Sequence, residues 1–447
     1  MFYQKKIAIY KNLFNSNQLG ATKPEIGFLN YFNRWIVVFI CIWYTWPFIN
    51  YRLGILPLLI LILLWFLTTD LRWVVKGLTI DLVMCVIWFI SFLPYILTNN
   101  FHFGNLNPKY VLISFLLFFC GMFMNHYYMY YNKNIKTLGT ISFFTILFYF
   151  IASFQSYFGL KEYPLAARTL ATGNYDPLMQ TYMSLGIGGF GFVYSAVFVN
   201  IVLLYFVLNK DNRIIMINKI IALVAFTMIT MMLLVASYAT SLLFLFVGCV
   251  FVFFIRGKRS FIFSFIFAFF LFLLVPSEMI GYLLIDVAKL FKDNGVINSK
   301  FTDLAQGFIS DSFGSQTSGR GQLYLTSLQT FIHNPLFGIY GPFGDNFNAE
   351  VGGHSGWLDF LAYYGLFGSL PLFAAIFFNF KKQLKIFFNH PYRHFILTAQ
   401  ILFIIFGFIN PVLYIYQLGF ALFVVLPSIP YLPVMFSNQP YEKGISK

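Results

Sequence analysis

Charged residues are scarce in this chain of 447 residues, since only 10% of them are Asp, Glu, Lys or Arg. A soluble domain carries about 25% charged residues, because its surface faces water. Hydrophobic residues make up 59% of the chain, and its mean hydropathy is +0.76. The charge is too sparse to cover a soluble surface of this size. The composition therefore excludes an ordinary soluble protein and predicts an integral membrane protein.

Metal-binding motifs are also missing, and cysteines are few. The sequence has no DxD motif, no HExxH motif and no clustered pair of His and Cys. It therefore predicts neither a metal nor a cofactor, and it disfavours a metal-dependent transferase that uses nucleotide sugars. No CxxC spacing occurs, so we interpret the cysteines as small hydrophobic residues within apolar runs: Cys41, Cys85, Cys120 and Cys249.

Long apolar runs are what the chain has in abundance. A helix needs about 20 apolar residues to cross a bilayer. On this basis the sequence predicts twelve transmembrane helices, near residues 35–50, 53–69, 78–98, 110–129, 137–158, 184–208, 214–236, 240–255, 260–277, 357–379, 394–411 and 413–433. The predicted fold is an all-α polytopic membrane protein.

The net charge of +14 follows from 29 Lys and Arg against 15 Asp and Glu. With twelve spans and the N-terminus in the cytoplasm, most of these basic residues fall in cytoplasmic segments, although the outer loops are longer. The positive-inside rule therefore predicts that both termini are cytoplasmic, and it explains the basic excess without nucleic acid as a partner. The first 34 residues are polar and basic, so no cleavable signal peptide is expected.

This topology divides the chain into five predicted segments. They are a cytoplasmic N-terminal segment (1–34), helices 1–9 (35–277), a large extracytoplasmic loop (278–356), helices 10–12 (357–433) and a cytoplasmic tail (434–447). The large loop is too long for a passive connector. Its apolar spacing predicts short amphipathic helices at 278–292 and 322–333, separated by a polar, glycine-rich and flexible stretch at 306–321.

Ionisable side chains suited to chemistry gather in the outer loops rather than inside the bilayer. Asp81 is the one acidic residue expected well inside a span, and no cation is an obvious partner for it. We interpret Asp81 as a packing contact, with a functional group as the alternative. The outer loops and their borders, in contrast, collect Arg168, Asp176, Arg320, His333, Asp345, Glu350, His354 and Asp359.

Three of these residues are candidates for binding and catalysis. Arg168 and Arg320 carry guanidinium groups, which suit pyrophosphate oxygens, although Arg168 is equally suited to a lipid phosphate. Arg320 lies between Gly319 and Gly321 at the expected start of a helix, so it is either a helix-end residue or part of an anion site. His354 is a candidate general base with a structural alternative, whereas we interpret His333 as structural.

The region from Ser318 to Leu372 resembles the signature region of the O-antigen polymerase and ligase superfamily, which contains Wzy-like polymerases and WaaL-like ligases. The shared elements occur in the same order: Arg320 on an amphipathic helix, Asn334-Pro335-Leu336-Phe337-Gly338, His354 before the next span, and Tyr364-Gly365-Leu366-Phe367-Gly368. The layout of twelve spans with a large outer loop is similar along nearly the whole chain.

This resemblance implies a metal-independent, inverting glycosyltransferase of GT-C-type architecture in the bacterial inner membrane. Its donor and acceptor would be undecaprenyl-pyrophosphate-linked glycans at the outer leaflet, and its other partners would be membrane lipids, a chain-length regulator and a flippase. Arg168, Arg320 and His354 match the family's arginines and histidine. Tyr238 stands about where ligases carry another Arg, a departure that favours a polymerase.

The expected function is therefore polymerisation of O-antigen or capsule repeat units. Arg168 and Arg320 would bind the pyrophosphate, and His354 would take the proton of the acceptor hydroxyl. The substrate site is expected to be completed by Tyr238, Glu350, Trp357 and Asp359. Two alternatives remain open, namely a ligase that transfers a finished glycan to lipid A core, another surface acceptor or protein, and a polysaccharide or lipid transporter.

Overall fold

The computed structural model describes residues 28–97, 108–172, 177–208, 216–236, 238–254 and 277–432, apart from 293–294, 296–297, 300, 303–304, 306–314, 341–349, 389, 391 and 414. Helices are the regular structure of these residues, and no strand occurs among them. Nearly all of the predicted ninth span, most of the predicted flexible stretch, and the candidates Asp176 and Asp345 lie outside the described residues.

The chain forms two compact units. Unit 1 comprises Met1–Lys23, Leu78–Phe119 and Ser237–Gly419, and unit 2 comprises Pro24–Gly77, Cys120–Ala236 and Phe420–Lys447. Helix α7 (Pro108–Asn125) runs from unit 1 into unit 2. The segments of each unit are far apart in the sequence, so neither unit is a continuous domain.

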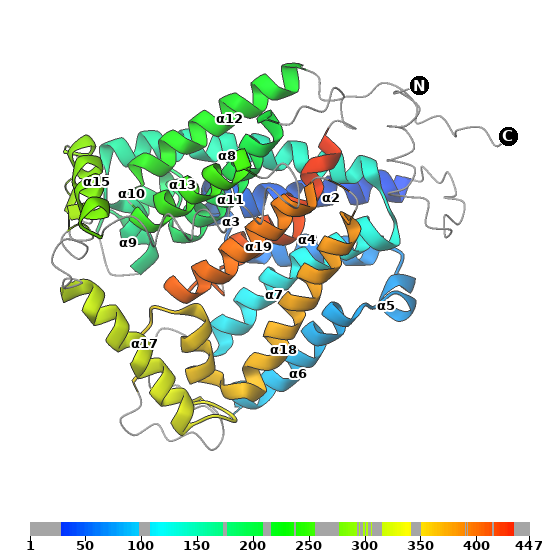
Figure 1. The fold of residues 1–447 in the computed structure, drawn as a ribbon. Coiled ribbons are helices and arrows are strands. Elements are labelled where there is room, and N and C mark those ends of the chain that lie inside the picture. Colours follow the sequence, from blue (N-terminus) through cyan, green and yellow to red (C-terminus); the bar gives the residue numbers. More distant parts are fainter. Residues whose placement is uncertain are drawn as a thin grey trace. The chain divides into compact units, whose positions relative to one another are not determined.

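Unit 1 contains the two helices of the predicted outer loop and the helices that follow them. In chain order its helices are α6 (Ile80–Leu97), α13 (Ala239–Phe254), α15 (Ser277–Leu290), α17 (Ser315–His333), α18 (Gly356–Ile386) and α19 (Tyr392–Ile409), followed by most of α20 (Tyr416–Phe420). Figure 1 shows α6 and α18 side by side, and α17 lies against α18.

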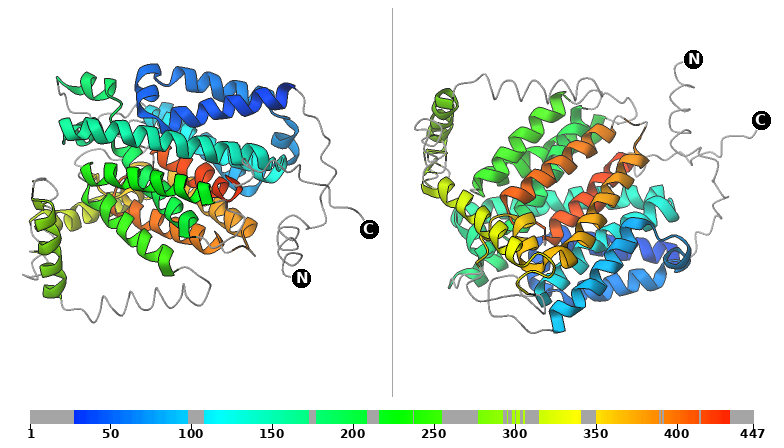
Figure 2. Two further views of the ribbon diagram at one scale, coloured as in Figure 1. Left: turned by 90° about the horizontal axis from the view of Figure 1, so that it is seen from above. Right: turned by 60° about the horizontal axis from the view of Figure 1, so that its bottom comes forward.

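Unit 2 is built from the first helices, the middle helices and the end of the described chain. Its helices are α2 (Phe28–Thr45), α3 (Pro47–Leu53), α4 (Leu56–Thr68), α5 (Arg72–Lys76), the π-helix η1 (His126–Tyr131), α8 (Ile135–Glu162), α9 (Ala166–Thr172), α10 (Met179–Ser184), α11 (Phe190–Leu208), α12 (Met216–Val235), the π-helix η2 (Ala421–Val425), α21 (Leu426–Ser428) and the 3-10 helix η3 (Ile429–Tyr431). Helix α2 packs against both α4 and α8 (Figure 2).

The described helices are those of a polytopic membrane protein. Six of them are long and apolar enough to cross a bilayer, or seven if the bent pair α2 and α3 counts as one span. The six are Ile80–Leu97, Val111–Tyr131, Ile135–Glu162, Phe190–Leu208, Gly356–Ile386 and Tyr392–Ile409. Four shorter apolar helices lie at other predicted spans: Leu56–Thr68, Lys219–Val235, Thr240–Val252 and Tyr416–Tyr431.

Helix α6 illustrates why these helices need lipid. Its inner face buries Leu82, Cys85, Trp88, Phe92 and Tyr95, as expected of a helix in a packed core. Its outer face is equally apolar and exposes a stripe at helical spacing, formed by Val83, Val86, Ile87, Ile90, Leu93 and Leu97. A helix that is apolar on all sides is stable only when its outward face meets other apolar groups. Hydrocarbon chains of lipids meet this requirement.

The first predicted span differs from the structure. The sequence predicted one helix over 35–50, whereas α2 ends at Thr45 and α3 leaves it at an angle of 98°. Pro47 explains the bend, because proline lacks an amide hydrogen and clashes with the preceding helical turn, but fits the first turn of a new helix. The Trp46 indole supports the corner by donating to Gln155 Oε1 at 2.6 Å.

The expectation that Asp81 has no cationic partner is wrong. Lys382 Nζ lies 3.1 Å from Asp81 Oδ2, although the two residues are 301 positions apart. Thr79 and Asn379 also donate to the carboxylate, at 2.5 and 2.8 Å. These contacts join α6 to α18 within unit 1, so Asp81 does make a packing contact. They also compensate a charge that is costly to bury.

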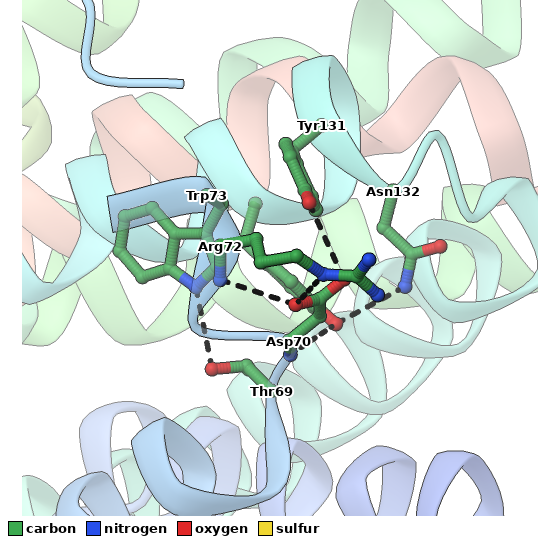
Figure 3. A network of polar contacts seen from close by, with 7 residues as sticks. Thr69, Asp70, Arg72, Trp73, Tyr131 and Asn132 are labelled. Atoms are coloured by element: carbon green, nitrogen blue, oxygen red, sulfur yellow. Dashed lines mark hydrogen bonds and ion pairs between the residues drawn. The ribbon is translucent and has the colours of Figure 1, made fainter. Parts of the chain in front are cut away.

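A second polar network lies in unit 2, where α4 leads into α5 (Figure 3). Arg72 Nε donates to both carboxylate oxygens of Asp70, at 2.9 and 3.1 Å, and the Tyr131 hydroxyl donates to Oδ2 at 3.3 Å. The hydrogen bond from Arg72 holds the pKa of Asp70 below its usual value. Through Tyr131 the network ties the turn after α4 to the π-helix η1.

Candidate functional site

The loop that carries His354 is attached to the helix before it. We call residues 350–355 the His354 loop; it leads into α18. The hydroxyl of Thr330, on α17, donates to the carbonyl of Glu350 at 2.5 Å. One turn earlier on α17, the hydroxyl of Ser327 accepts the amide hydrogen of Gly352 at 2.9 Å. Two polar side chains of α17 therefore hold the loop at two points.

A buried carboxylate completes this attachment. Asp359, in the first turn of α18, has an exposed fraction of only 2%. Its Oδ1 accepts from the Ser327 hydroxyl at 2.6 Å, and its Oδ2 accepts from the amide of Ser355 at 2.9 Å. Since Ser355 directly follows His354, the carboxylate fixes the peptide group that joins these two residues. Asp359 thus links α17, the His354 loop and α18.

Glycine is required where the loop meets α17. A Cβ on Gly352 would lie 2.3 Å from the backbone oxygen of Leu323, well inside any real contact. Gly353 has a positive φ of 71°, a conformation that side-chain-bearing residues rarely adopt. The pair Gly352-Gly353 therefore allows the backbone to approach α17 closely and then turn, which leaves His354 exposed to solvent.

The other side of the loop is held by α19. The amide of Gly356 donates to the carbonyl of Asn410 at 3.1 Å. The indole of Trp357 donates to the carbonyl of Ile404 at 2.9 Å, and its ring packs so closely on α19 that a Cβ on Gly407 would lie 2.4 Å from Nε1. Trp357, which we predicted to contact substrate, therefore anchors the start of α18 on α19.

Helix α18 is broken one and a half turns after Asp359. Gly365 has φ 59° and ψ −165°, which is far from helical, so α18 consists of two helical halves. A break inside a span leaves backbone N–H and C=O groups without helical partners. In hydrocarbon each such group costs several kcal/mol unless it is satisfied within the protein. The partners of these groups are therefore decisive for the fold.

Most of these partners come from residues 334–340, which we call the docking segment. The amides of Ile339 and Tyr340 donate to the carbonyls of Ala362 and Tyr363 before the break, at 3.1 and 3.0 Å. The amides of Leu366 and Phe367 after the break donate to the carbonyls of Pro335 and Leu336, at 2.8 and 2.9 Å. The two motifs quoted for the resemblance thus bond to each other, backbone to backbone.

Side chains complete the break. The Tyr95 hydroxyl donates to the carbonyl of Tyr364 at 2.5 Å, and the Trp88 indole donates to the carbonyl of Gly368 at 2.9 Å. Both donors come from α6. The ring of Tyr340 stacks on Tyr363 with centroids 5.0 Å apart, and burial raises the pKa of Tyr340 to about 12. Tyr340 therefore remains a neutral hydrogen-bonding group at physiological pH.

The result is a frame attached through the C-terminal half of α17. There Ser327 and Thr330 hold the His354 loop, and the docking segment that follows α17 bonds to the break in α18. Helix α17 also carries Arg320. The frame therefore fixes the backbone that bears Arg320 relative to the backbone that bears His354.

Helix α17 begins earlier than expected. The sequence predicted a helix over 322–333 with Arg320 at its start, but α17 begins at Ser315, so Arg320 lies in its second turn. The amides of the first turn therefore belong to residues before Arg320. His333, at the other end of α17, has Nδ1 at 2.7 Å from the carbonyl of Gln329, which fits the structural role predicted for it.

The remaining candidates divide between the two units. Glu350 is exposed on the His354 loop. Tyr238 is buried just before α13, which packs against α19 in unit 1. Arg168 lies on the short helix α9 of unit 2, where it is half-buried next to the buried Ala166 and Ala167. Of the candidates that the structure describes, unit 1 thus contains all except Arg168.

Three features of this site were not found by sequence reasoning. Ser327 was an unremarked serine on an amphipathic helix, and nothing in the sequence marks it as a link to Asp359. Gly338 and Gly365 were quoted only as parts of motifs. A glycine within an apolar run is a weak signal of a break. In this chain the break at Gly365 depends on the docking segment that bonds to it. Within the described residues, no group of three or more metal-ligand side chains occurs.

Comparison with known proteins adds no relative to this picture. No protein-family model matches the chain, and no curated protein matches it significantly. The functional argument therefore depends on the residues and their geometry.

Proposed function

We propose that this protein polymerises lipid-linked oligosaccharide repeat units of a bacterial O-antigen or capsule. In this proposal the chain crosses the inner membrane twelve times, has both termini in the cytoplasm and has a GT-C-type architecture. The observation that carries the proposal is the frame in unit 1, in which one helix bears an arginine and the loop attached to it bears an exposed histidine. A rigid scaffold is what a site for charge stabilisation and proton transfer needs.

The proposed reaction uses each group for one task. The acceptor hydroxyl attacks the anomeric carbon of the donor from the face opposite the pyrophosphate. The bond from this carbon to the pyrophosphate oxygen breaks, and its electron pair leaves with undecaprenyl pyrophosphate. The hydroxyl proton passes to the imidazole of His354. Arg320 neutralises the charge that grows on the leaving group, and the anomeric configuration inverts. The resemblance assigns the same task to Arg168.

The test is polymerisation by the purified protein. The protein in detergent with EDTA is incubated with the undecaprenyl-pyrophosphate-linked repeat unit isolated from the cells that make it. We expect a ladder of glycans, and we expect it to disappear in Arg168→Ala, Arg320→Ala and His354→Ala. His333→Ala is the matched control, because it removes a histidine outside the proposed site and should leave the ladder intact. A ladder that persists in all three variants would refute the site.

A ligase is the nearest alternative and would give a different product in the same assay. With lipid A core added, a ligase transfers one glycan to this acceptor and produces no ladder from repeat units alone. The residue that separates these proposals is Tyr238, which is buried and cannot supply the cation that ligases carry there. Tyr238→Arg should not create ligation if the chain is a polymerase.

One observation favours a transporter, namely the ion pair between Asp81 and Lys382. Ionisable residues inside membrane spans often mark ion or substrate pathways. If the chain is a transporter, His354→Ala leaves polymer length normal and lowers export, whereas Asp81→Asn abolishes export. If it is a polymerase, His354→Ala leaves glycans at one repeat unit. Glycan length in cells therefore decides between the two.

A further inference from the structure

We propose that Asp359 and Ser327 are positioning residues for His354, which hold its backbone in place and bring a carboxylate within electrostatic range of its imidazole. This inference rests on the proposed function, because it assigns a task to residues around the proposed base. It changes our prediction for Asp359, from a substrate contact to a buried support of His354.

The backbone on both sides of His354 is fixed by this pair. On one side the amide of Gly352 donates to the Ser327 hydroxyl at 2.9 Å, and on the other the amide of Ser355 donates to Asp359 at 2.9 Å. The hydroxyl of Ser327 in turn donates to Asp359 at 2.6 Å. A chain of hydrogen bonds thus runs from one flank of His354 to the other. It leaves the imidazole itself exposed, as a base that meets a substrate must be.

The same carboxylate acts on the protonation of His354. Asp359 and His354 interact electrostatically, but this is the smallest influence on a carboxyl whose charged form is opposed chiefly by burial and supported by its hydrogen bonds from Ser327 and Ser355. When His354 takes a proton, a nearby negative charge stabilises the imidazolium and so favours the transfer. The buried carboxylate cannot be replaced by solvent in this role, since water reaches little of its surface.

Other titratable groups are few around this loop. Glu350 lies on the loop itself, and His333 lies at the end of α17. Arg320 lies about two turns before Ser327 on α17. From α19 the described contacts are the backbone carbonyls of Ile404, Gly407 and Asn410. Glu350 is therefore the acidic residue from which the effect of Asp359 must be distinguished.

The titration of His354 tests this directly and needs no substrate. The protein is labelled with 13C at Cε1 of histidine, reconstituted in nanodiscs and titrated by NMR, and the His354 resonance is identified by its loss in His354→Ala. We expect Asp359→Asn to lower the pKa of His354, because the imidazolium loses its counter-charge. Glu350→Gln, which removes the other carboxylate, should leave this pKa in place. An unchanged pKa in Asp359→Asn, or an equal shift in Glu350→Gln, would overturn the proposal.

A second measurement covers the case in which Asp359→Asn does not fold. Ser327→Ala removes the hydroxyl that links Gly352 to Asp359. We expect faster deuterium uptake in residues 350–355 without a change in α6, and we expect Ser327→Thr to restore the slow uptake. Equal uptake in Ser327→Ala and the wild type would contradict the positioning role.

The polymerisation assay separates this inference from the proposed function. If the wild type forms a ladder, Asp359→Asn should reduce its rate and move the acidic limb of the pH profile to lower pH, because His354 then loses its proton more readily. If the wild type forms a ladder but Asp359→Asn leaves the acidic limb of the pH profile unchanged, the positioning role is refuted and the polymerase proposal stands. No ladder from the wild type, together with the expected NMR shift, refutes the polymerase and leaves the link between Asp359 and His354 standing.

Discussion

Gly338 and Gly365 meet backbone to backbone at the break in α18. A Cβ on Gly365 would lie 2.5 Å from the nitrogen of Gly338, and a Cβ on Gly338 would lie 2.4 Å from the backbone of Tyr363. We therefore expect Gly365→Ala to displace the docking segment and to lower the thermal midpoint and the folded yield in detergent. Unfolding can be followed with a thiol-reactive dye, because Cys41, Cys85 and Cys120 are buried.

Gly54 provides a matched control for this substitution. Its φ of 65° and ψ of −162° are nearly those of Gly365, at 59° and −165°, but a Cβ on Gly54 would meet no atom within 4 Å. Gly54→Ala therefore carries only the backbone strain, of about 1–3 kcal/mol. The loss of stability in Gly365→Ala beyond that in Gly54→Ala measures the contribution of the close approach between Gly365 and the docking segment. Equal losses in the two variants would show that the contact with the docking segment contributes nothing.

The sequence predicted the positions of most helices well, because a long apolar run can hardly be anything else in this chain. The break in α18 could not be predicted in the same way. Its predicted span, 357–379, reads as one continuous apolar segment. The break exists because residues 334–340 supply hydrogen-bonding partners to backbone groups on both sides of Gly365. A pairing between distant segments leaves no periodic trace in either of them.

The ion pair of Asp81 and Lys382 leads to a second prediction. The exposed fractions of the two side chains are 1% and 11%, so removal of either partner leaves a charge buried alone. We expect Lys382→Met to cost about 3 kcal/mol of stability or more. The double variant Asp81→Asn/Lys382→Met should lose less stability than the sum of the two single variants, because it leaves no unpaired charge behind.

Lys381 is the control for this experiment. It is adjacent in the sequence but exposed, so Lys381→Met should leave the thermal midpoint unchanged. If Lys381→Met and Lys382→Met destabilise the protein equally, the loss reflects the positive charge of this part of α18 and not the ion pair. Strictly additive losses in the double variant would likewise contradict the coupling.

The network in Figure 3 predicts a small dependence of stability on pH. The pKa of Asp70 is lowered in the folded state, chiefly by its hydrogen bond with Arg72. A lowered pKa contributes stability that is fully present above the ordinary value of 3.8 and is lost as the pH falls through the folded value. Because the pair is largely exposed, we expect a contribution below about 1 kcal/mol.

Thermal midpoints of the wild type and Asp70→Asn at pH 6.5 and pH 3 check this prediction. The wild type should be slightly more stable at pH 6.5, and the difference should narrow at pH 3, which lies below the ordinary pKa of 3.8 and closer to the lowered pKa of the folded state. Arg72→Gln should behave like Asp70→Asn at both pH values. A difference as large at pH 3 as at pH 6.5 would mean that Asp70 acts through its packing rather than its charge.

The candidate site was predictable as residue types but not as an arrangement. His354 and Arg320 stand out in sequence because imidazole and guanidinium groups are rare in this apolar chain. Their supports do not stand out, since Ser327 is 32 residues from Asp359 and looks like any serine on an amphipathic helix. The same holds for Lys382, which the sequence presents as one of several cations in a loop.

The last prediction concerns the kind of cation that the site needs. A guanidinium group offers a planar fork of donors that matches two oxygens of a pyrophosphate at once, whereas a lysine is a point charge. If Arg320 binds the leaving group in this way, Arg320→Ala should lower the rate of ladder formation about 100-fold or more. Arg320→Lys should recover only part of this loss, because it restores the charge without the fork. Arg393→Lys is the control, since Arg393 stacks over the Phe388 ring at 4.5 Å, at the start of α19 and away from the His354 loop. A lysine variant as active as the wild type would show that charge alone suffices, and an active Arg320→Ala would remove Arg320 from the mechanism.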